Sequence, residues 1–265
     1  MRRVLTIAGS DPSAGAGVQL DLKVFERLGV YGMTVITALT AQNSVGVQKI
    51  AKVAPRVVEA QIDSVHSDIG VDACKIGMLY SSATVMSVVG RIRRREIPNV
   101  VLDPVLAAKD GTAMLSASGI RKMKRYLIPR ALVVTPNVPE AEILSGMQIE
   151  SLDDLRLAVR EIHAMGCGYV LAKGGHLDGE PVDVLFDGEE MIDLAGSRFD
   201  GPPVHGTGCA FSAALVARIA LGDGAQYRGR LGVYDTGRGA ALGSAVLLIP
   251  HLHTIGGIRS QKGVR

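Results

Sequence analysis

The stretch VLTIAGSDPSAGAGVQLDL, residues 4–22, sets the pattern for the whole chain. Its apolar start, Val4 to Ala8, predicts a buried strand, and the helix that follows begins near Val18. Between them lies the loop Gly9 to Gly17, whose small residues let a ligand approach the backbone closely. The run that starts at Gly15 has Leu20 where a GxGxxG fingerprint needs its third glycine, which disfavours a dinucleotide fold. A glycine-rich turn without a ligand stays open as an alternative.

The same order of strand and helix recurs along most of the chain. Helical spacing of apolar residues marks Pro55 to Ser67 and Ser151 to Met165, the second with Ser151 as a cap, Asp154 in the first turn and Gly166 as a stop. The predicted buried strands are residues 4–8, 34–38, 73–76, 100–102, 132–135 and 169–172. This alternation predicts an α/β fold with a mostly parallel sheet and helices on both faces.

Two segments break the alternation. Gln42 to Val53 and Val182 to Leu194 have extended patterns, and the second predicts a hairpin that turns at Asp187-Gly188. We interpret both as small flaps over one end of the sheet. Because ligands of open parallel sheets sit beyond the carboxyl ends of the strands, the loops there are the candidates for chemistry.

Composition limits the class of protein. The chain has 265 residues, of which 47% are hydrophobic and 21% charged, as in an ordinary globular domain, and we read residues 1–265 as a single one. The formal charge of +3 arises in the glycine-rich tail 226–265, which carries six basic residues and one acidic residue. The basic character therefore belongs to the tail, and with 4% aromatic residues and no Trp we predict no binding of nucleic acid.

Cysteine usage bears on the compartment. Cys74, Cys167 and Cys209 form no CxxC pair, which favours reduced thiols. The apolar run after Arg3 is too short for a signal peptide, and no window reaches the length of a membrane span. We therefore expect a cytoplasmic protein without a membrane partner.

A second glycine-rich loop, His205-Gly206-Thr207-Gly208-Cys209, precedes an apolar helix from Ala210 to Leu221. Unpaired N–H groups at a helix N-terminus form an anion site suited to a transferring phosphoryl group. Cys209 would sit in the first turn, where the helix dipole is expected to lower the pKa of its thiol. A capped turn with a buried cysteine is the alternative, and no P-loop motif is present.

Polar side chains follow three further strands. Asp103 comes directly after residues 100–102, and Asn137 and Glu140 follow residues 132–135. Oxygen ligands at the ends of parallel strands suit Mg²⁺, although helix capping by Asn137 and an exposed Asp103 remain open. Lys173 follows residues 169–172 and places a cation at the same edge, where it can meet a phosphate.

Taken together, these loops resemble the ribokinase-like superfamily, and within it the hydroxymethylpyrimidine and phosphomethylpyrimidine kinases of thiamine biosynthesis. The resemblance implies a three-layer αβα architecture. Seven motifs carry it in the family order: residues 6–23, 35–43, 75–79, 102–105, 135–140, 173–176 and 205–209.

The resemblance also implies an activity and its site. The reaction is ATP-dependent phosphorylation of 4-amino-5-hydroxymethyl-2-methylpyrimidine and then of its monophosphate, with Mg²⁺, in a protein that is commonly a homodimer. Gln42 would bind the aminopyrimidine edge, and the same pocket would be lined by Gly9, Asp21, Met78 and Val105. Mg²⁺ would be organised by Asp103, Asn137 and Glu140, and the phosphates held by Lys173, Gly206, Thr207 and Gly208. Cys209 stands where many sugar kinases of the superfamily have an Asp general base.

Two departures and two other functions accompany the resemblance. Ala14 stands where the family commonly has Gly, a mild change if its φ is negative, and the tail 226–265 lacks the amphipathic helix expected after Leu221. A pyridoxal kinase shares the fold and is one alternative. The other is a catalytically weak pyrimidine-binding regulatory protein, which the unusual tail suggests.

Overall fold

The computed structural model describes residues 1–43, 46–108, 111–197 and 205–222. The tail 226–265, and with it the question of a further helix after Leu221, lies outside the described residues. Within the described ranges, no helix is both long enough and apolar enough to span a membrane.

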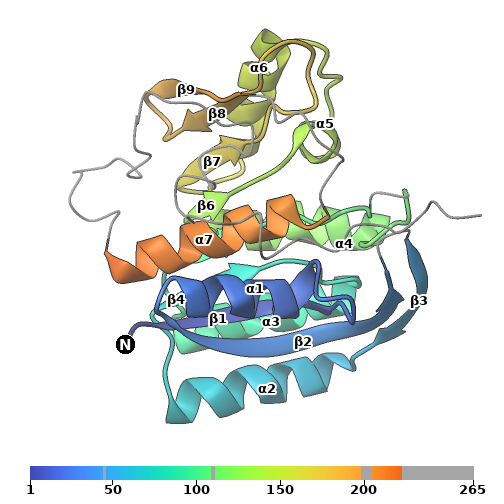
Figure 1. Cartoon of the computed structure of the whole chain (residues 1–265), viewed down its shortest axis with the longest axis vertical. Helices are drawn as coiled ribbons and strands as arrows, with labels where there is room; N and C mark the ends of the chain where they lie inside the picture. The colour runs from blue at the N-terminus through green and yellow to red at the C-terminus, as the bar shows by residue number, and fades with distance from the viewer. Residues whose placement is uncertain (44–45, 109–110, 198–204, 223–265) are drawn as a thin grey trace, which may run out of the picture.

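One sheet of nine strands forms the centre of the described part of the chain, in the order β3-β2-β1-β4-β5-β6-β7-β8-β9 (Figure 1). The strands from β2 through β7 in this order run parallel. At the edges of the sheet, β3 is antiparallel to β2, β8 to β7 and β9 to β8. Their bounds are β1 Arg3–Ser10, β2 Tyr31–Gln42, β3 Val47–Lys52, β4 Ala73–Ile76, β5 Val100–Leu102, β6 Val133–Val134, β7 Tyr169–Ala172, β8 Val182–Phe186 and β9 Met191–Ala195.

The helices cover both faces of this sheet. Their bounds are α1 Gly17–Arg27, α2 Pro55–Asp68, α3 Ser82–Arg95, α4 Ala117–Lys122, α5 Val138–Ser145, α6 Leu152–His163 and α7 Thr207–Leu221, with the single turns η1 Met123–Leu127 and η2 Ile128–Arg130 after α4. Figure 1 shows α1 and α7 side by side on one face of the sheet, with α2 and α3 on the other face.

Alternate residues of the strands explain these three layers. In β1, Leu5 and Ile7 belong to the core shared with α2, α3, α5 and α6, whereas Val4 packs into the core shared with α1 and α7. Successive side chains of a strand point to opposite faces, so a strand that is apolar throughout is buried on both. The predicted α/β fold with helices on both faces is confirmed.

The strand order creates a switch point beside β1. The chain goes from β1 to β2 on one side, then returns through β3 and α2 to β4 on the other side of β1. In open α/β sheets ligands bind at such a point, outside the carboxyl ends of the strands. The loops after β1, β4, β5, β6 and β7 all open toward this edge.

The capped helix predicted over 151–165 is confirmed. Ser151 accepts a hydrogen bond from the Asp154 N–H, and the Asp154 carboxylate accepts one from the Ser151 N–H, so the two form a reciprocal capping box. Gly166 ends the segment in the left-handed region at φ 103°. The sequence signals at both ends therefore have the expected backbone geometry.

The two extended segments lie at opposite edges of the sheet. β3 pairs with the second half of β2, whose pairing with β1 ends at Leu39, so this ribbon reaches beyond the strand end toward the site. The hairpin of β8 and β9 turns at Asp187-Gly188 as predicted and continues the sheet beside β7. The first segment thus has the place of a flap, and the second is part of the sheet itself.

Ala14 does not have the negative φ under which its replacement of Gly would be mild. Its φ is +55°, in the left-handed region, so its replacement of the family's usual Gly is not the mild change that a negative φ would make it. The Cβ of an L-residue approaches the following carbonyl oxygen in this conformation, which costs roughly 1–2 kcal/mol.

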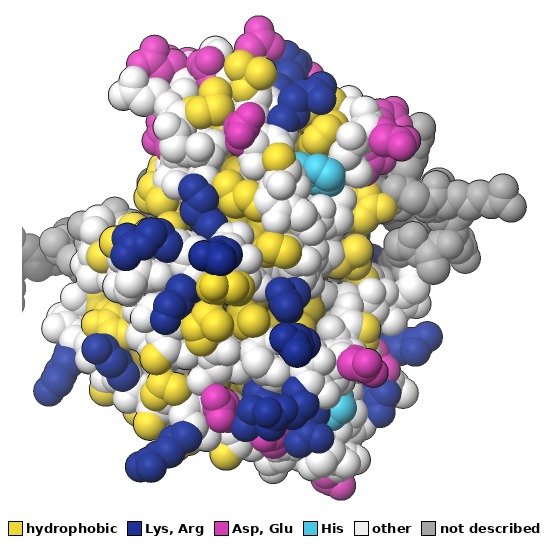
Figure 2. Space-filling view, turned by 180° about the vertical axis from the view of Figure 1, so that it is seen from behind, with side chains coloured by type: hydrophobic (Ala, Val, Ile, Leu, Met, Phe, Trp, Pro, Cys, Tyr) yellow, Lys and Arg dark blue, Asp and Glu magenta, His cyan; other side chains and the backbone are white. Residues whose placement is uncertain are grey.

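The face opposite to that of Figure 1 is rich in basic side chains. Figure 2 shows many Lys and Arg side chains over its middle and lower parts, with several Asp and Glu side chains near the top and others toward the right and the bottom. The basic residues in the last turns of α3 and α4 are Arg93, Arg94, Arg95, Arg121 and Lys122. Cations in that position complement the negative end of the helix dipole, which gives them a structural role.

Candidate active site

The N-terminus of α7 reaches the carboxyl edge of the sheet. Its cap residue Gly206 has φ +84°, and an added Cβ there would lie 1.8 Å from the carbonyl oxygen of Gly15. No described side chain caps this helix, so the N–H groups of its first turn are those that an α-helix leaves unpaired. The second glycine-rich loop therefore packs directly on the first and presents an anion site beside it.

Cys209 lies in the first turn of α7, where the Gly17 N–H donates a hydrogen bond to its sulfur. Burial raises the pKa of this thiol to about 11, and the nearby Lys75 ammonium only partly offsets the effect. The lowered pKa predicted from the helix dipole is therefore wrong. Removal from water disfavours the thiolate more than the dipole and the cation favour it.

Lys173 and Asp103 meet at this helix end. The Lys173 Nζ lies 3.4 Å from Oδ1 of Asp103, and an added Cβ on Gly208 would be 3.2 Å from the same Nζ. Burial alone would raise the pKa of Asp103, but Lys173, Lys75 and the Ser212 hydroxyl hold it below its usual value. Asp103 is buried, so the exposed position left open by the sequence is excluded.

Asn137 and Glu140 form a second capping box, at the start of α5. The Glu140 N–H donates to Oδ1 of Asn137, and the Asn137 N–H donates to Oε2 of Glu140, each over 2.9 Å. Burial raises the pKa of Glu140 to about 7; Lys173 counteracts this and Asp103 adds to it. Asn137 is thus a helix cap, the alternative left open above, while Glu140 is a buried carboxyl group facing the charges of the site.

Asp21 and Lys75 form an ion pair without exposed side-chain surface. The Lys75 Nζ lies 2.5 Å from Oδ1 of Asp21 and 3.5 Å from the Cys209 carbonyl oxygen, and Thr6 donates to the other carboxylate oxygen. Burial alone would lower the pKa of Lys75, but the Asp21 carboxylate raises it. Asp21 therefore does not line an open pocket as predicted, because both of its oxygens are engaged inside the protein.

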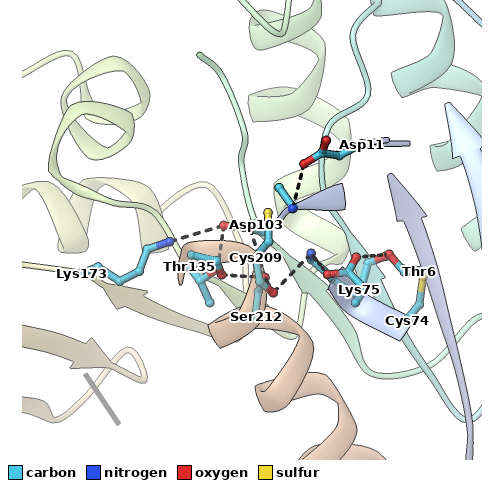
Figure 3. A network of polar contacts seen from close by, with 12 residues as sticks. Thr6, Asp11, Cys74, Lys75, Asp103, Thr135, Lys173, Cys209 and Ser212 are labelled. Carbon is cyan, nitrogen blue, oxygen red and sulfur yellow. Dashed lines mark hydrogen bonds and ion pairs between the residues drawn. The ribbon is translucent and has the colours of Figure 1, made fainter. Parts of the chain in front are cut away.

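These contacts form a continuous row behind the first turn of α7 (Figure 3). The row runs through Lys173, Asp103, Ser212, Cys209, Lys75, Asp21 and Thr6. Sequence reasoning missed Lys75, although a lysine inside the predicted buried strand 73–76 was itself a signal, since a buried lysine requires a partner.

Three of the predicted pocket residues gather at the ends of β1, β4 and β5. An added Cβ on Gly9 would lie 2.3 Å from Cε of Met78, so these two residues touch. Met78 forms a small apolar cluster with Ala38 and Met114, against which Val105 packs. The cluster gives this end of the sheet the apolar character that contact with a flat ring requires.

Gln42, the predicted ring-binding residue, lies at the end of β2 next to His205. Nε2 of His205 is 3.0 Å from the Gln42 amide nitrogen and 3.3 Å from Oδ2 of Asp11. Asp11 also accepts hydrogen bonds from the N–H groups of Ser13 and Ala16, which fix the first loop. Sequence reasoning missed Asp11 and gave His205 no role; the run Asp11-Pro12-Ser13, typical of an Asx turn, was the available signal.

Among the described residues, no cluster of three or more Asp, Glu, His or Cys is arranged to hold a metal. The Asp103 carboxylate is close enough to Glu140 to raise the pKa of its carboxyl group. Mg²⁺ commonly binds through one or two carboxylates together with the phosphates of a substrate. This pair therefore fits a metal that arrives with a nucleotide.

Comparison with known proteins identifies the relatives of this chain. The family model for phosphomethylpyrimidine kinase matches residues 11–227. The hydroxymethylpyrimidine/phosphomethylpyrimidine kinase of Escherichia coli is 47% identical over 221 residues, which cover 82% of this chain and 83% of that protein.

Two solved structures are similar. The phosphomethylpyrimidine kinase of Clostridium difficile 630 has a TM-score of 0.75 at 40% identity, covering 84% of this chain and 92% of that one. The pyridoxal kinase of Bacillus subtilis, solved as an ADP complex, has a TM-score of 0.78 at 40% identity, covering 84% and 85%. Since the family model spans most of the chain and the relatives align over nearly the same range, the chain belongs to the phosphomethylpyrimidine kinase family.

Proposed function

We propose that the protein transfers the γ-phosphoryl group of ATP to the hydroxymethyl group of 4-amino-5-hydroxymethyl-2-methylpyrimidine, and then a second one to the resulting monophosphate. The observation that carries this proposal is the junction of the α7 N-terminus with Lys173, beside Gly208. N–H groups and an ammonium directed at one point suit a phosphoryl group whose charge develops during transfer. The membership of the family supports the pyrimidine as substrate.

In the first reaction the substrate hydroxyl oxygen bonds to the γ-phosphorus while the bond from that phosphorus to the β-bridging oxygen breaks and ADP leaves. The N–H groups at the start of α7 and Lys173 stabilise the transferring group. In the second reaction a phosphate oxygen of the monophosphate is the nucleophile, so no hydroxyl proton has to be removed. The two steps can therefore share the same anion site.

Cys209 is the candidate acceptor of the hydroxyl proton because it lies in the first turn of α7. With a pKa of about 11 its thiolate is scarce at neutral pH, so this role requires a rate of the first reaction that rises with pH. Cys209→Ala should then lower kcat of the first reaction by about 10²–10⁴-fold. An unchanged turnover would remove this role and leave Cys209 a packing residue.

We propose Asp103 and Glu140 as the protein ligands of Mg²⁺, with Asn137 holding the Glu140 backbone by its cap. The metal would supply neutralisation of the charge on the ATP phosphates when bound. Two carboxyl groups in a buried site, one with a raised pKa, have the donor chemistry that a divalent cation favours. Lys173, Gly206, Thr207 and Gly208 would hold the phosphates around it.

The proposal is tested by an ADP-release assay with ATP, Mg²⁺ and hydroxymethylpyrimidine, in which the monophosphate and the diphosphate are separated. Monophosphate should appear first and diphosphate after it. ADP release that does not depend on the pyrimidine would contradict the proposed function.

Phosphorylation of pyridoxal is the second candidate, because a solved pyridoxal kinase is as similar to this chain as a solved phosphomethylpyrimidine kinase. We expect kcat/KM to be higher for the pyrimidine when the two substrates are compared at equal concentration. The resemblance further supports a cytoplasmic homodimer, which light scattering after gel filtration would identify by its mass.

A further inference from the structure

Donors and acceptors are poorly matched around the side chains of Gln42 and His205. As placed, the Gln42 amide nitrogen is 3.0 Å from Nε2 of His205, whose other neighbour is Oδ2 of Asp11 at 3.3 Å. An amide nitrogen only donates and a carboxylate only accepts, whereas a ring nitrogen either carries a proton or has a free lone pair. Nε2 of His205 therefore cannot satisfy both neighbours in this arrangement.

The other end of the same amide has a matching conflict. The Thr40 hydroxyl lies 2.9 Å from the Ser10 carbonyl oxygen and 3.3 Å from Oε1 of Gln42, and both are acceptors. One hydroxyl carries one proton, and the shorter contact to Ser10 uses it, so Oε1 of Gln42 is left with only a weak share. Two independent neighbours of the Gln42 amide thus each require the opposite group.

Exchange of the amide oxygen and nitrogen resolves both conflicts at once. The single Nε2–H proton of His205 is then shared between two acceptors, Oδ2 of Asp11 and Oε1 of Gln42. The Gln42 amide nitrogen donates to the Thr40 hydroxyl, which donates to Ser10. The two ends of an amide have nearly the same shape, so the surrounding partners decide its direction. A carboxylate only accepts, so a proton on Nε2 is the arrangement in which His205 bonds to Asp11.

We propose that His205 is a positioning residue that fixes the direction of the Gln42 amide. The direction of this amide then determines which edge of the substrate ring it can bind. The proposal rests on the proposed function. Each amide group retains one bonding site that no described residue uses: a lone pair on the oxygen beside His205 and an N–H beside Thr40. A ring that bears an amino group next to a ring nitrogen matches this order, with its amino group on the His205 side.

Two variants, His205→Leu and His205→Gln, distinguish this positioning role from a role in packing. His205→Leu keeps the bulk and removes the donor, and we expect it to raise the KM for hydroxymethylpyrimidine about tenfold, with kcat and the KM for ATP changed less than about threefold. His205→Gln keeps a donor near the place of Nε2 and should restore a KM within about threefold of the wild type. Titration calorimetry of the pyrimidine without ATP provides a readout independent of turnover, and thermal unfolding verifies the fold.

A double-mutant cycle tests whether His205 acts through Gln42. In a Gln42→Ala background, His205→Leu should change pyrimidine binding by less than about twofold, because the amide that it orients is absent. His66→Leu, on α2, is the control for loss of a histidine outside the site and should match the wild type.

Three results would overturn the proposal: an unchanged pyrimidine KM in His205→Leu, a His205→Gln variant as impaired as His205→Leu, or effects that multiply in the double variant. Failure of the proposed function has a different signature. In that case the wild type itself neither binds the pyrimidine nor releases ADP with it, and the inference falls with the function.

Discussion

Ala14 occupies a backbone conformation that suits glycine. Because its φ is +55°, Ala14→Gly should relieve a steric cost and raise the free energy of unfolding by about 1 kcal/mol, even after the greater flexibility of the unfolded chain is counted. Urea unfolding of the two proteins measures the difference. Ala164→Gly is the matched control: its φ is −59°, so glycine there should destabilise the protein, and equal effects at both positions would contradict this account.

Glu140 makes stability depend on pH. Its pKa is raised from 4.5 to about 7 in the folded protein, so its contribution is full below pH 4.5, falls as the pH rises because the unfolded chain ionises first, and is lost above pH 7. Glu140→Gln lacks this titration. We expect its stability relative to the wild type to increase from pH 4.5 to 8, by up to about 3 kcal/mol.

Thermal unfolding of both proteins across this pH range, without divalent cations, is the measurement. Glu161→Gln, an exposed position on α6, is the control and should show a constant difference. A constant difference for Glu140→Gln as well would mean that the carboxyl group ionises freely in the folded protein.

The N-cap position of α7, Gly206, has no room for a side chain. Gly206→Ala would meet both a positive φ and the Gly15 carbonyl oxygen, so the helix start would have to move and kcat should fall with stability. Gly222→Ala, at the other end of the same helix, meets the positive φ alone, since nothing lies within 4 Å of its added Cβ. We expect about 1 kcal/mol of destabilisation and normal activity at Gly222, and at least twice that cost at Gly206.

Steady-state kinetics and chemical unfolding of the two variants test this comparison. If Gly222→Ala lowered kcat as much as Gly206→Ala, the whole helix and not its N-terminal cap would be the sensitive part.

The sequence of this chain predicts the positions of its strands and helices well. Apolar runs located the strands at 73–76, 100–102 and 169–172 with the observed bounds, and Ser151 with Asp154 located a helix start. Both signals are local, since they depend on burial of a short run and on the needs of a helix terminus. The positive φ of Ala14 could not be predicted from the sequence, because the packing of its loop determines it.

At the scale of the molecule, the sequence predicted at which edge of the sheet the site lies, but not which of its charged side chains pair with each other. The ends of parallel strands had to bring Asp103, Glu140 and Lys173 to one edge, and they do. The pairing of Asp21 with Lys75 and the depth of Cys209 depend on how α1 and α7 pack on the sheet, which spacing along the chain does not contain. Prediction from sequence therefore failed where chemistry depends on burial.

The contact of Gly206 with Gly15 also has a consequence for the order in which the molecule becomes an enzyme. These residues are 206 − 15 = 191 positions apart, and closing a loop of that length costs roughly 5 kcal/mol of chain entropy before any contact repays it. On the ribosome, every strand of the described ranges emerges before α7 does. The nascent chain can assemble its described sheet before α7 is made, but the apolar sheet face that α7 covers stays exposed until then. The anion site also stays incomplete, so catalysis has to wait for the synthesis of α7.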